Sequence, residues 1–247
     1  MDVDALIDQL DRHGHGLADT ASAVGEHAAV PTCPGWDVRA LLAHTGMVQR
    51  WASENVRNGQ ARPGDPAELH QAPEAGIVEW FREGHADLVA ALTAAPGDLE
   101  AMTFLAGAGP ARHFWARRQA HETTVHHADA AAAAGAVPEI DPVLALDGIG
   151  ELLEGFYGRR GGKLRADPPI TVRVAPFDFE LSWTVQIGPE SRTVTRDADG
   201  PVDCTLRGAA ADLYLYLWNR SPAGPVEVDG DERATEVWRE LARVRWG

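Results

Sequence analysis

The sequence predicts an α+β protein: a bundle of four helices over residues 1–138, followed by a smaller α+β domain over residues 139–247. In the first part apolar residues recur at intervals of three, four and seven, as they do along one face of a helix. After Gly135 short segments that alternate or run apolar lie between turn residues, which is typical of strands. The second part, about 100 residues of strands and flanking helices, has the content of a small α+β domain.

The first predicted helix covers residues 3–24. Its apolar positions lie on one face: Leu6, Leu10, Leu17, Ala21 and Val24. Gly14 and Gly16 weaken the middle of this helix, because glycine is a poor helix former.

The second predicted helix starts after the loop at 31–35. Asp37 can cap its free backbone N–H groups, and Trp36 before it can pack onto Leu41. Four residues share one face of this helix: Leu41, His44, Val48 and Trp51. His44 therefore lies in the apolar stripe of the helix rather than on its polar side.

Two more helices complete the predicted bundle. A polar segment with two prolines, residues 58–72, is expected to be a loop. The third helix covers about 74–95 and ends at a Pro-Gly pair, and a glycine-rich joint at 106–110 leads into the fourth helix at about 112–134. Facing helices of such a bundle commonly build a metal site in the core.

The second domain is predicted to mix helices and strands. A helix at about 142–157 ends in a glycine-rich turn at 158–162. The expected strands are 170–174, 179–187, 193–195, 203–206 and 226–228, with helices at 209–219 and from Asp231 to about Arg243.

Composition argues against nucleic acid or a membrane as a partner. The formal net charge is −15 at pH 7, which disfavours binding to a phosphate backbone or an anionic lipid surface. There is no basic leader before an apolar core and no apolar run of about 18 residues, so neither secretion nor a membrane span is expected. The sequence does not distinguish a monomer from a homodimer.

The two cysteines, Cys33 and Cys204, form no metal-binding pattern and suggest no disulfide framework. A reducing, cytoplasmic location is therefore expected. Because no base is spaced to activate Cys33 as a nucleophile, we expect this residue to serve packing in its loop.

The main chemical feature is a polar stripe on the fourth helix. Glu122 and His126 are four residues apart, which places a carboxylate and an imidazole one turn apart on the same face. Arg118 and Asp129 extend the stripe. Together with His44 from the second helix, Glu122 and His126 would supply the three protein ligands that a catalytic zinc site needs. Asp129 could then orient His126, and Arg118 could pair with a carboxylate.

The same residues also have ordinary structural explanations. Arg118 and Glu122 could form an ion pair on a solvated face, and His44 could be a core histidine. His121 and His127 lie off the stripe and are expected to face solvent.

Three segments resemble the mycothiol-dependent maleylpyruvate isomerase family, part of a wider DinB-like group of thiol-using metal proteins. They are Val30–Arg39 with His44, Arg118–Asp129, and Asp212–Arg220. The similarity covers nearly the whole chain in the same order. It implies a DinB-like four-helix bundle followed by a sterol-carrier-like α+β domain.

The resemblance also implies a divalent metal, typically zinc, on His44, Glu122 and His126, with mycothiol or another low-molecular-weight thiol as cosubstrate. Ligand type alone does not separate zinc from nickel, iron or cobalt. Arg220 matches an arginine that would hold a carboxylate of substrate or thiol, and Arg118 is assigned to the same cofactor-binding set. Arg220 could instead interact with the last carbonyls of its own helix.

The implied chemistry begins with attack by a thiolate, which zinc keeps deprotonated at neutral pH. In an isomerase the thiolate adds to the cis double bond of a maleylpyruvate-like diacid, allows rotation about the new single bond, and leaves. In a transferase it attacks a small electrophile and stays attached. The ligand set does not choose between these reactions.

Two other functions are compatible with these features. A non-catalytic metal-containing binding or resistance protein could hold a small molecule among four tryptophans: Trp36, Trp51, Trp80 and Trp115. It would retain its ligand without consuming thiol. A hydrolase would use metal-activated water and a general base, with His113 and His121 as candidates.

Overall fold

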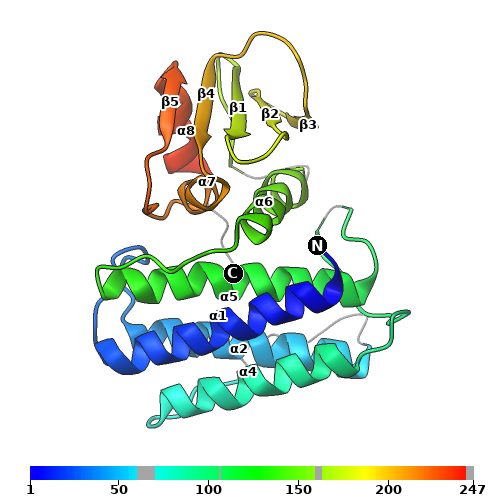
Figure 1. The fold of residues 1–247 in the computed structure, drawn as a ribbon, viewed down its shortest axis with the longest axis vertical. Helices are drawn as coiled ribbons and strands as arrows, with labels where there is room; N and C mark the ends of the chain where they lie inside the picture. Colours follow the sequence, from blue (N-terminus) through cyan, green and yellow to red (C-terminus); the bar gives the residue numbers. More distant parts are fainter. Residues whose placement is uncertain (60–69, 106, 159–162, 243–247) are drawn as a thin grey trace. The chain divides into compact units, whose positions relative to one another are not determined.

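The computed structural model describes residues 1–59, 70–105, 107–158 and 163–242 (Figure 1). The chain divides into two compact units. The first comprises Met1–Phe104 and Ala108–Glu139, and the second comprises Leu105–Gly107 and the chain from Ile140 onward. Parts of four predicted segments lie outside the described residues: the loop at 58–72, the joint at 106–110, the turn at 158–162 and the end of the closing helix.

Within the part of the first unit that the structure describes, four long helices are present, as predicted (Figure 1). Their bounds are Val3–Val24 for α1, Val38–Asn58 for α2, Ile77–Ala94 for α4 and Ala111–Ala133 for α5. Helix α1 packs against α4 and α5, and α2 packs against the same two helices. Each predicted helix is therefore present to within about one turn at its ends.

The start of α2 is set by its predicted cap. The Asp37 carboxylate accepts a hydrogen bond from the backbone N–H of Ala40 at 2.8 Å. Trp36 packs against an apolar core cluster that also contains Leu41. The buried members of this cluster are Leu17, Ala18, Ala21, Val30, Val38, Leu41, Leu42, Ile77, Phe81 and Ala130. Because Val30 and Val38 flank the loop at 31–35, the cluster anchors that loop at both ends.

The two glycines of α1 have a packing role. A Cβ atom on Gly14 would lie 2.1 Å from Cε1 of His85, and one on Gly16 would lie 2.4 Å from Cε1 of His127. Both distances are far below van der Waals contact. The glycines therefore let imidazole rings from α4 and α5 rest directly on the backbone of α1.

We expect Gly14→Ala to destabilise the protein by about 1–3 kcal/mol, the usual effect of overpacking a core. Helix propensity alone predicts the opposite, a gain of about 1 kcal/mol. Urea unfolding of the variant and the parent measures the difference. The matched control is Gly97→Ala, because a Cβ atom there meets nothing within 4 Å. A Gly14→Ala protein more stable than its parent would mean that the His85 ring moves aside freely.

The second unit combines a five-stranded sheet with short helices. The strands are β1 Ile170–Pro176, β2 Trp183–Ile187, β3 Arg192–Arg196, β4 Cys204–Gly208 and β5 Glu227–Gly230. The helices are α6 Pro142–Gly150, the π-helix η1 Glu151–Phe156, α7 Ala210–Leu217 and α8 Arg233–Leu241. The strand order is β3-β2-β1-β4-β5, in which β1 and β4 are parallel and the other neighbours antiparallel. The predicted α+β class is therefore confirmed.

Two predicted elements differ in detail. The helix expected at 142–157 changes from α to π geometry at Glu151. The strand expected at 179–187 begins only at Trp183. Before it, residues 179 and 180 form a bend, so the chain turns here instead of extending the sheet. The Asp178 carboxylate just before this bend accepts a hydrogen bond from the backbone N–H of Ala210 at 3.0 Å. Within the described residues, no helix is both long enough and apolar enough to cross a membrane.

Candidate metal centre

Three side chains from α2 and α5 meet inside the first unit. His44 Nε2 lies 3.5 Å from Glu122 Oε1, and His126 Nε2 lies 3.2 Å from the same oxygen. The three donor atoms all lie within 4.8 Å of one another. Glu122 and His126 are buried, whereas the His44 side chain is 17% exposed. The ligand count of a catalytic zinc site and the family resemblance both pointed to His44 as the third donor, although 78 residues separate it from Glu122.

Arg118 fixes the other oxygen of Glu122. Its Nη2 lies 3.2 Å from Glu122 Oε2, and both side chains are buried. The alternative of an ion pair on a solvated face is therefore wrong for this pair. Helix α5 packs against α1, α2 and α4, which covers the face that carries the stripe. Arg118, which the resemblance assigned to cofactor binding, thus pairs with a carboxylate of the cluster.

The Asp129 carboxylate contacts the second ring nitrogen of His126, the one that does not face Glu122. Its Oδ2 lies 2.9 Å from His126 Nδ1, and the carboxylate is fully buried. The hydroxyl of Thr32 and the thiol of Cys33 also donate to Asp129, Cys33 at 3.4 Å. Thr32 and Cys33 were not predicted to take part in the site, and they lie 97 and 96 residues before Asp129. No local pattern in the sequence signals contacts of that kind.

The electrostatics of the cluster favour its charged forms. Burial opposes a charge on Glu122, but hydrogen bonds from His126 and His44 and the charge of Arg118 hold the pKa of its carboxyl well below the ordinary value. Burial likewise opposes a charge on His126, but hydrogen bonds to Asp129 and Glu122 raise the pKa of its imidazole to about 9. Without a metal, the His126 ring is therefore protonated on both nitrogens, and its Nε2–H faces the Glu122 carboxylate. A cation that binds here must displace that proton.

The donor set fits a divalent metal. Ligands about 2.0–2.1 Å from a tetrahedral zinc ion lie roughly 3.3 Å from one another. The two distances to Glu122 Oε1, 3.2 and 3.5 Å, bracket that value. Two imidazoles and one carboxylate are a common ligand set of catalytic zinc, with a fourth position left for water or substrate. A carboxylate on the second nitrogen of a ligating histidine, as Asp129 is here, is the usual outer partner.

We expect Asp129→Asn to weaken metal binding about 10–100-fold while the three donor side chains stay in place. An amide can present its N–H₂ group to His126 Nδ1, which would place the ring proton on Nε2, the nitrogen that would bind the metal. Competition for zinc against a chelator of known affinity measures the change. An unaltered affinity would show that Asp129 only ties the 31–35 loop to α5.

The other histidines of α5 do not belong to the cluster. His121 is fully buried, so the expectation that it faces solvent is wrong. His127 is half-buried and its Nδ1 lies 3.0 Å from Nδ1 of His13. His113 Nε2 lies 3.1 Å from the carbonyl oxygen of Met1. Since His113 is about 20 Å along the helix from His126, it cannot serve as a base at this centre.

The four tryptophans do not line a common pocket. Trp51 and Trp115 pack edge to face, with ring centroids 5.1 Å apart. The Trp80 ring lies under the guanidinium of Arg50 at 3.9 Å. Only Trp36 is near the metal centre, with its ring centroid 5.1 Å from that of His44. Trp36 therefore lies beside the site, Trp115 is fully buried in the core, and Trp51 and Trp80 are partly buried.

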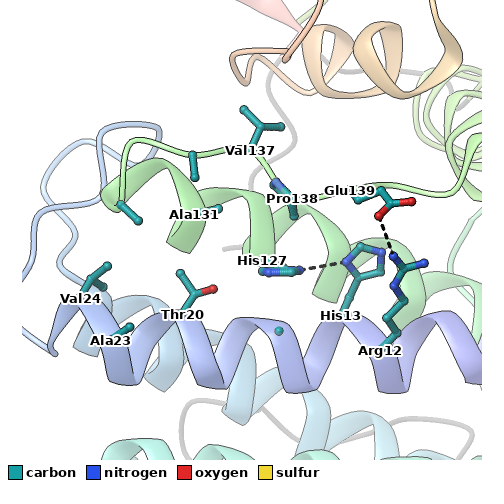
Figure 2. Close-up of a pocket in the computed structure, with 13 residues that line it drawn as sticks. Arg12, His13, Thr20, Ala23, Val24, His127, Ala131, Val137, Pro138 and Glu139 are labelled. Carbon is teal, nitrogen blue, oxygen red and sulfur yellow. Dashed lines mark hydrogen bonds and ion pairs between the residues drawn. The ribbon is translucent and has the colours of Figure 1, made fainter.

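A separate cavity of about 470 Å³ lies between α1, the end of α5 and the segment at 134–139 (Figure 2). Its walls are mostly apolar, and at one end the rings of His13 and His127 point toward each other. Arg12 pairs with Glu139 beside them at 3.4 Å. None of the three donor residues of the metal centre lines this cavity.

Arg220 lies in the second unit, just after α7. Its backbone N–H donates to the carbonyl of Leu215 and its Nη1 donates to the carbonyl of Trp218, both at 2.8 Å. These contacts place the cation at the C-terminal end of its own helix, where it interacts favourably with the last carbonyls.

Comparison with known proteins bears on both units. The family model of the mycothiol maleylpyruvate isomerase N-terminal domain matches residues 3–131, and that of the MDMPI C-terminal domain matches residues 143–236. Two solved structures, the mycothiol-dependent maleylpyruvate isomerase and a histidine-to-alanine variant of it, match with TM-scores of 0.61 and 0.64. Each is 14% identical and the match covers 93% of both chains, a likeness that concerns the fold. A search of curated protein sequences found no significant match.

Proposed function

Because the chain belongs to the mycothiol maleylpyruvate isomerase family, we propose that it is a metal-dependent enzyme in which a low-molecular-weight thiol such as mycothiol attacks a small electrophile. The reaction that we favour is cis–trans isomerisation of a maleylpyruvate-like diacid. The observation that carries the proposal is the cluster of three donor atoms from two helices, at the spacing of zinc ligands.

Each residue of the metal centre would have a separate role. His44, Glu122 and His126 would hold the metal, which when bound supplies a Lewis acid that keeps a thiol deprotonated at neutral pH. Arg118 occupies one oxygen of Glu122 and so directs the other toward the two imidazoles. Asp129 keeps Nδ1 of His126 protonated, which leaves Nε2 facing the centre.

Isomerisation regenerates the thiol. The thiolate forms a C–S bond to one carbon of the cis double bond, and the diacid takes up the electron pair as an enolate. Rotation about the resulting single bond is followed by collapse of the enolate, which re-forms the double bond as trans and expels the thiolate. A small amount of thiol therefore suffices for many turnovers. S-transfer, the second candidate reaction, begins with the same attack but retains the C–S bond.

Turnover assays with thiol separate the candidates. Purified, zinc-loaded protein is mixed with a maleylpyruvate-like diacid and with catalytic amounts of thiol. Isomerisation gives product in excess over thiol, whereas S-transfer stops when the thiol is consumed. Retention of the diacid without turnover, with or without thiol, would favour a non-catalytic binding protein and contradict the proposal.

Arg220→Ala is expected to raise the KM for the diacid or the thiol about tenfold or more, which corresponds to the loss of a charge-assisted hydrogen bond of about 1.5–3 kcal/mol. Metal content should not change. Steady-state kinetics with each substrate varied in turn measure the effect. Unchanged kinetics would leave Arg220 with only the role seen at the end of α7.

A further inference from the structure

A second three-donor cluster lies in the helical bundle, on α1 and α4. His15 Nε2 is 3.4 Å from Asp11 Oδ1, and His85 Nε2 is 3.3 Å from the same oxygen. The donor atoms all lie within 4.8 Å of one another. The rings of His15 and His85 meet edge to face, with centroids 5.6 Å apart. No residue of this cluster belongs to the metal centre described above.

The cluster is built from helix positions far apart in the chain. Asp11 and His15 are one turn apart on α1, with side chains 47% and 62% exposed, while His85 comes from α4 and is almost completely buried. Gly14 permits the approach, because any larger residue would place a Cβ atom 2.1 Å from the His85 ring. Phe81 stacks on the ring, with an interplanar angle of 8°. The buried imidazole is therefore held in one position against α1, facing the other two donors.

The geometry repeats that of the first centre. Each cluster has two imidazoles and one carboxylate, and in each a carboxylate and an imidazole are four residues apart on one helix. In each the second imidazole comes from a neighbouring helix, and both histidines use Nε2. The distances of 3.3 and 3.4 Å to Asp11 agree with the roughly 3.3 Å separation of ligands around a tetrahedral zinc ion.

We propose that Asp11, His15 and His85 form a second binding site for a divalent transition metal such as zinc, which would join α1 to α4. Three protein ligands leave the remaining position to water, because Asp11 and His15 lie on the solvent side of the cluster. The ion would stabilise the folded bundle by binding it in preference to the unfolded chain.

Gln49 supplies the outer partner of the buried ligand. Its Nε2 lies 3.4 Å from His85 Nδ1 and 3.0 Å from the hydroxyl oxygen of Thr123, while its Oε1 is buried without a hydrogen-bond partner among the described residues. A rotation of the amide by 180° brings Oε1 to this position. Oε1 then accepts hydrogen bonds from Nδ1–H of His85 and from Thr123. That arrangement leaves the lone pair of His85 Nε2 for a metal.

Counting bound zinc tests the proposal. Metal-stripped protein is dialysed against zinc and analysed for metal, and binding is followed by titration calorimetry. We expect two ions per chain in the parent, one in His15→Ala, one in His44→Ala and none in the double variant. His27→Ala should still bind two, because its exposed imidazole lies beside two carboxylates, 3.7 and 3.8 Å away, without belonging to a three-donor cluster.

The result separates this site from the first one. A single ion lost in His44→Ala and kept in His15→Ala would overturn the second site and leave the proposed function intact. A single ion lost in His15→Ala and kept in His44→Ala would support the second site and contradict the metal centre of the proposed function. Two ions in His15→Ala would also overturn the second site.

Thermal unfolding gives an independent readout. Zinc should raise the Tm of His44→Ala, because the ion still joins α1 and α4, but should not raise that of His44→Ala/His15→Ala. His15 is mostly exposed, so its replacement is not expected to prevent folding. An equal increase of Tm in both variants would assign the stabilisation to another site and overturn the proposal.

Discussion

Replacing His44 by alanine is expected to remove the bound metal of the first centre and to lower thiol-dependent turnover at least about 100-fold. Loss of a partner outside the ligand sphere already costs about 10–100-fold in metal affinity, and loss of a ligand should cost more. The fold should persist, because His44 is partly exposed and α2 is anchored by Val38, Leu41 and Leu42 in the apolar core cluster. The same result is expected for His126→Ala.

Metal retention, turnover and circular dichroism of the variants measure these effects. Metal is counted after dialysis against a chelator too weak to remove the ion from the first centre of the parent protein. This dialysis removes ions that are bound more weakly. His113→Ala is the matched control, since this histidine is also on α5 but lies about 20 Å along the helix from His126, with its Nε2 3.1 Å from the carbonyl oxygen of Met1. Retention of the metal in His44→Ala or His126→Ala would remove that residue from the ligand set. Loss of helical signal together with the metal would point to a structural role instead.

The second large effect is expected for Arg118→Met, which should destabilise the metal-free protein by about 3 kcal/mol. Removing one partner of a buried ion pair leaves the other charge uncompensated, at a cost of about 3–5 kcal/mol. We expect the lower end of this range, because the protonated His126 still faces Glu122. Methionine fills the space of the aliphatic stem without supplying a charge.

Urea unfolding in the presence of a chelator measures this change. Zinc should make the difference between variant and parent smaller, because a cation at the centre compensates the Glu122 carboxylate. Arg12→Met is the control: its ion pair with Glu139 is exposed, and such pairs contribute about 0–1 kcal/mol. If both substitutions had equally small effects, the buried pair of Arg118 and Glu122 would not be important for stability.

Local rules predicted most of the elements. The four helices of the bundle, the cap at Asp37 and the five strands follow from periodicity and from turn residues, all of which act over a few positions. The strand at β2 was predicted too long because the apolar pattern did not show that residues 179–180 form a bend before Trp183. The sequence predicted only that Gly14 and Gly16 weaken α1. Their packing role could not be predicted, because it depends on imidazole rings of other helices that contact the backbone of α1.

For the candidate site, the sequence by itself determined that Glu122 and His126 share a helix face, since helical spacing is a local property. The ligand count of a zinc site suggested His44 as the third donor, and the family resemblance implied the same residue. Only the tertiary structure decided that the face is buried, that Thr32 and Cys33 bind Asp129, and that His121 is covered rather than exposed. The physical reason is the same in each case. Burial and contacts between segments far apart in the chain depend on which helices pack together, and a periodic pattern shows only that a face exists, not what covers it.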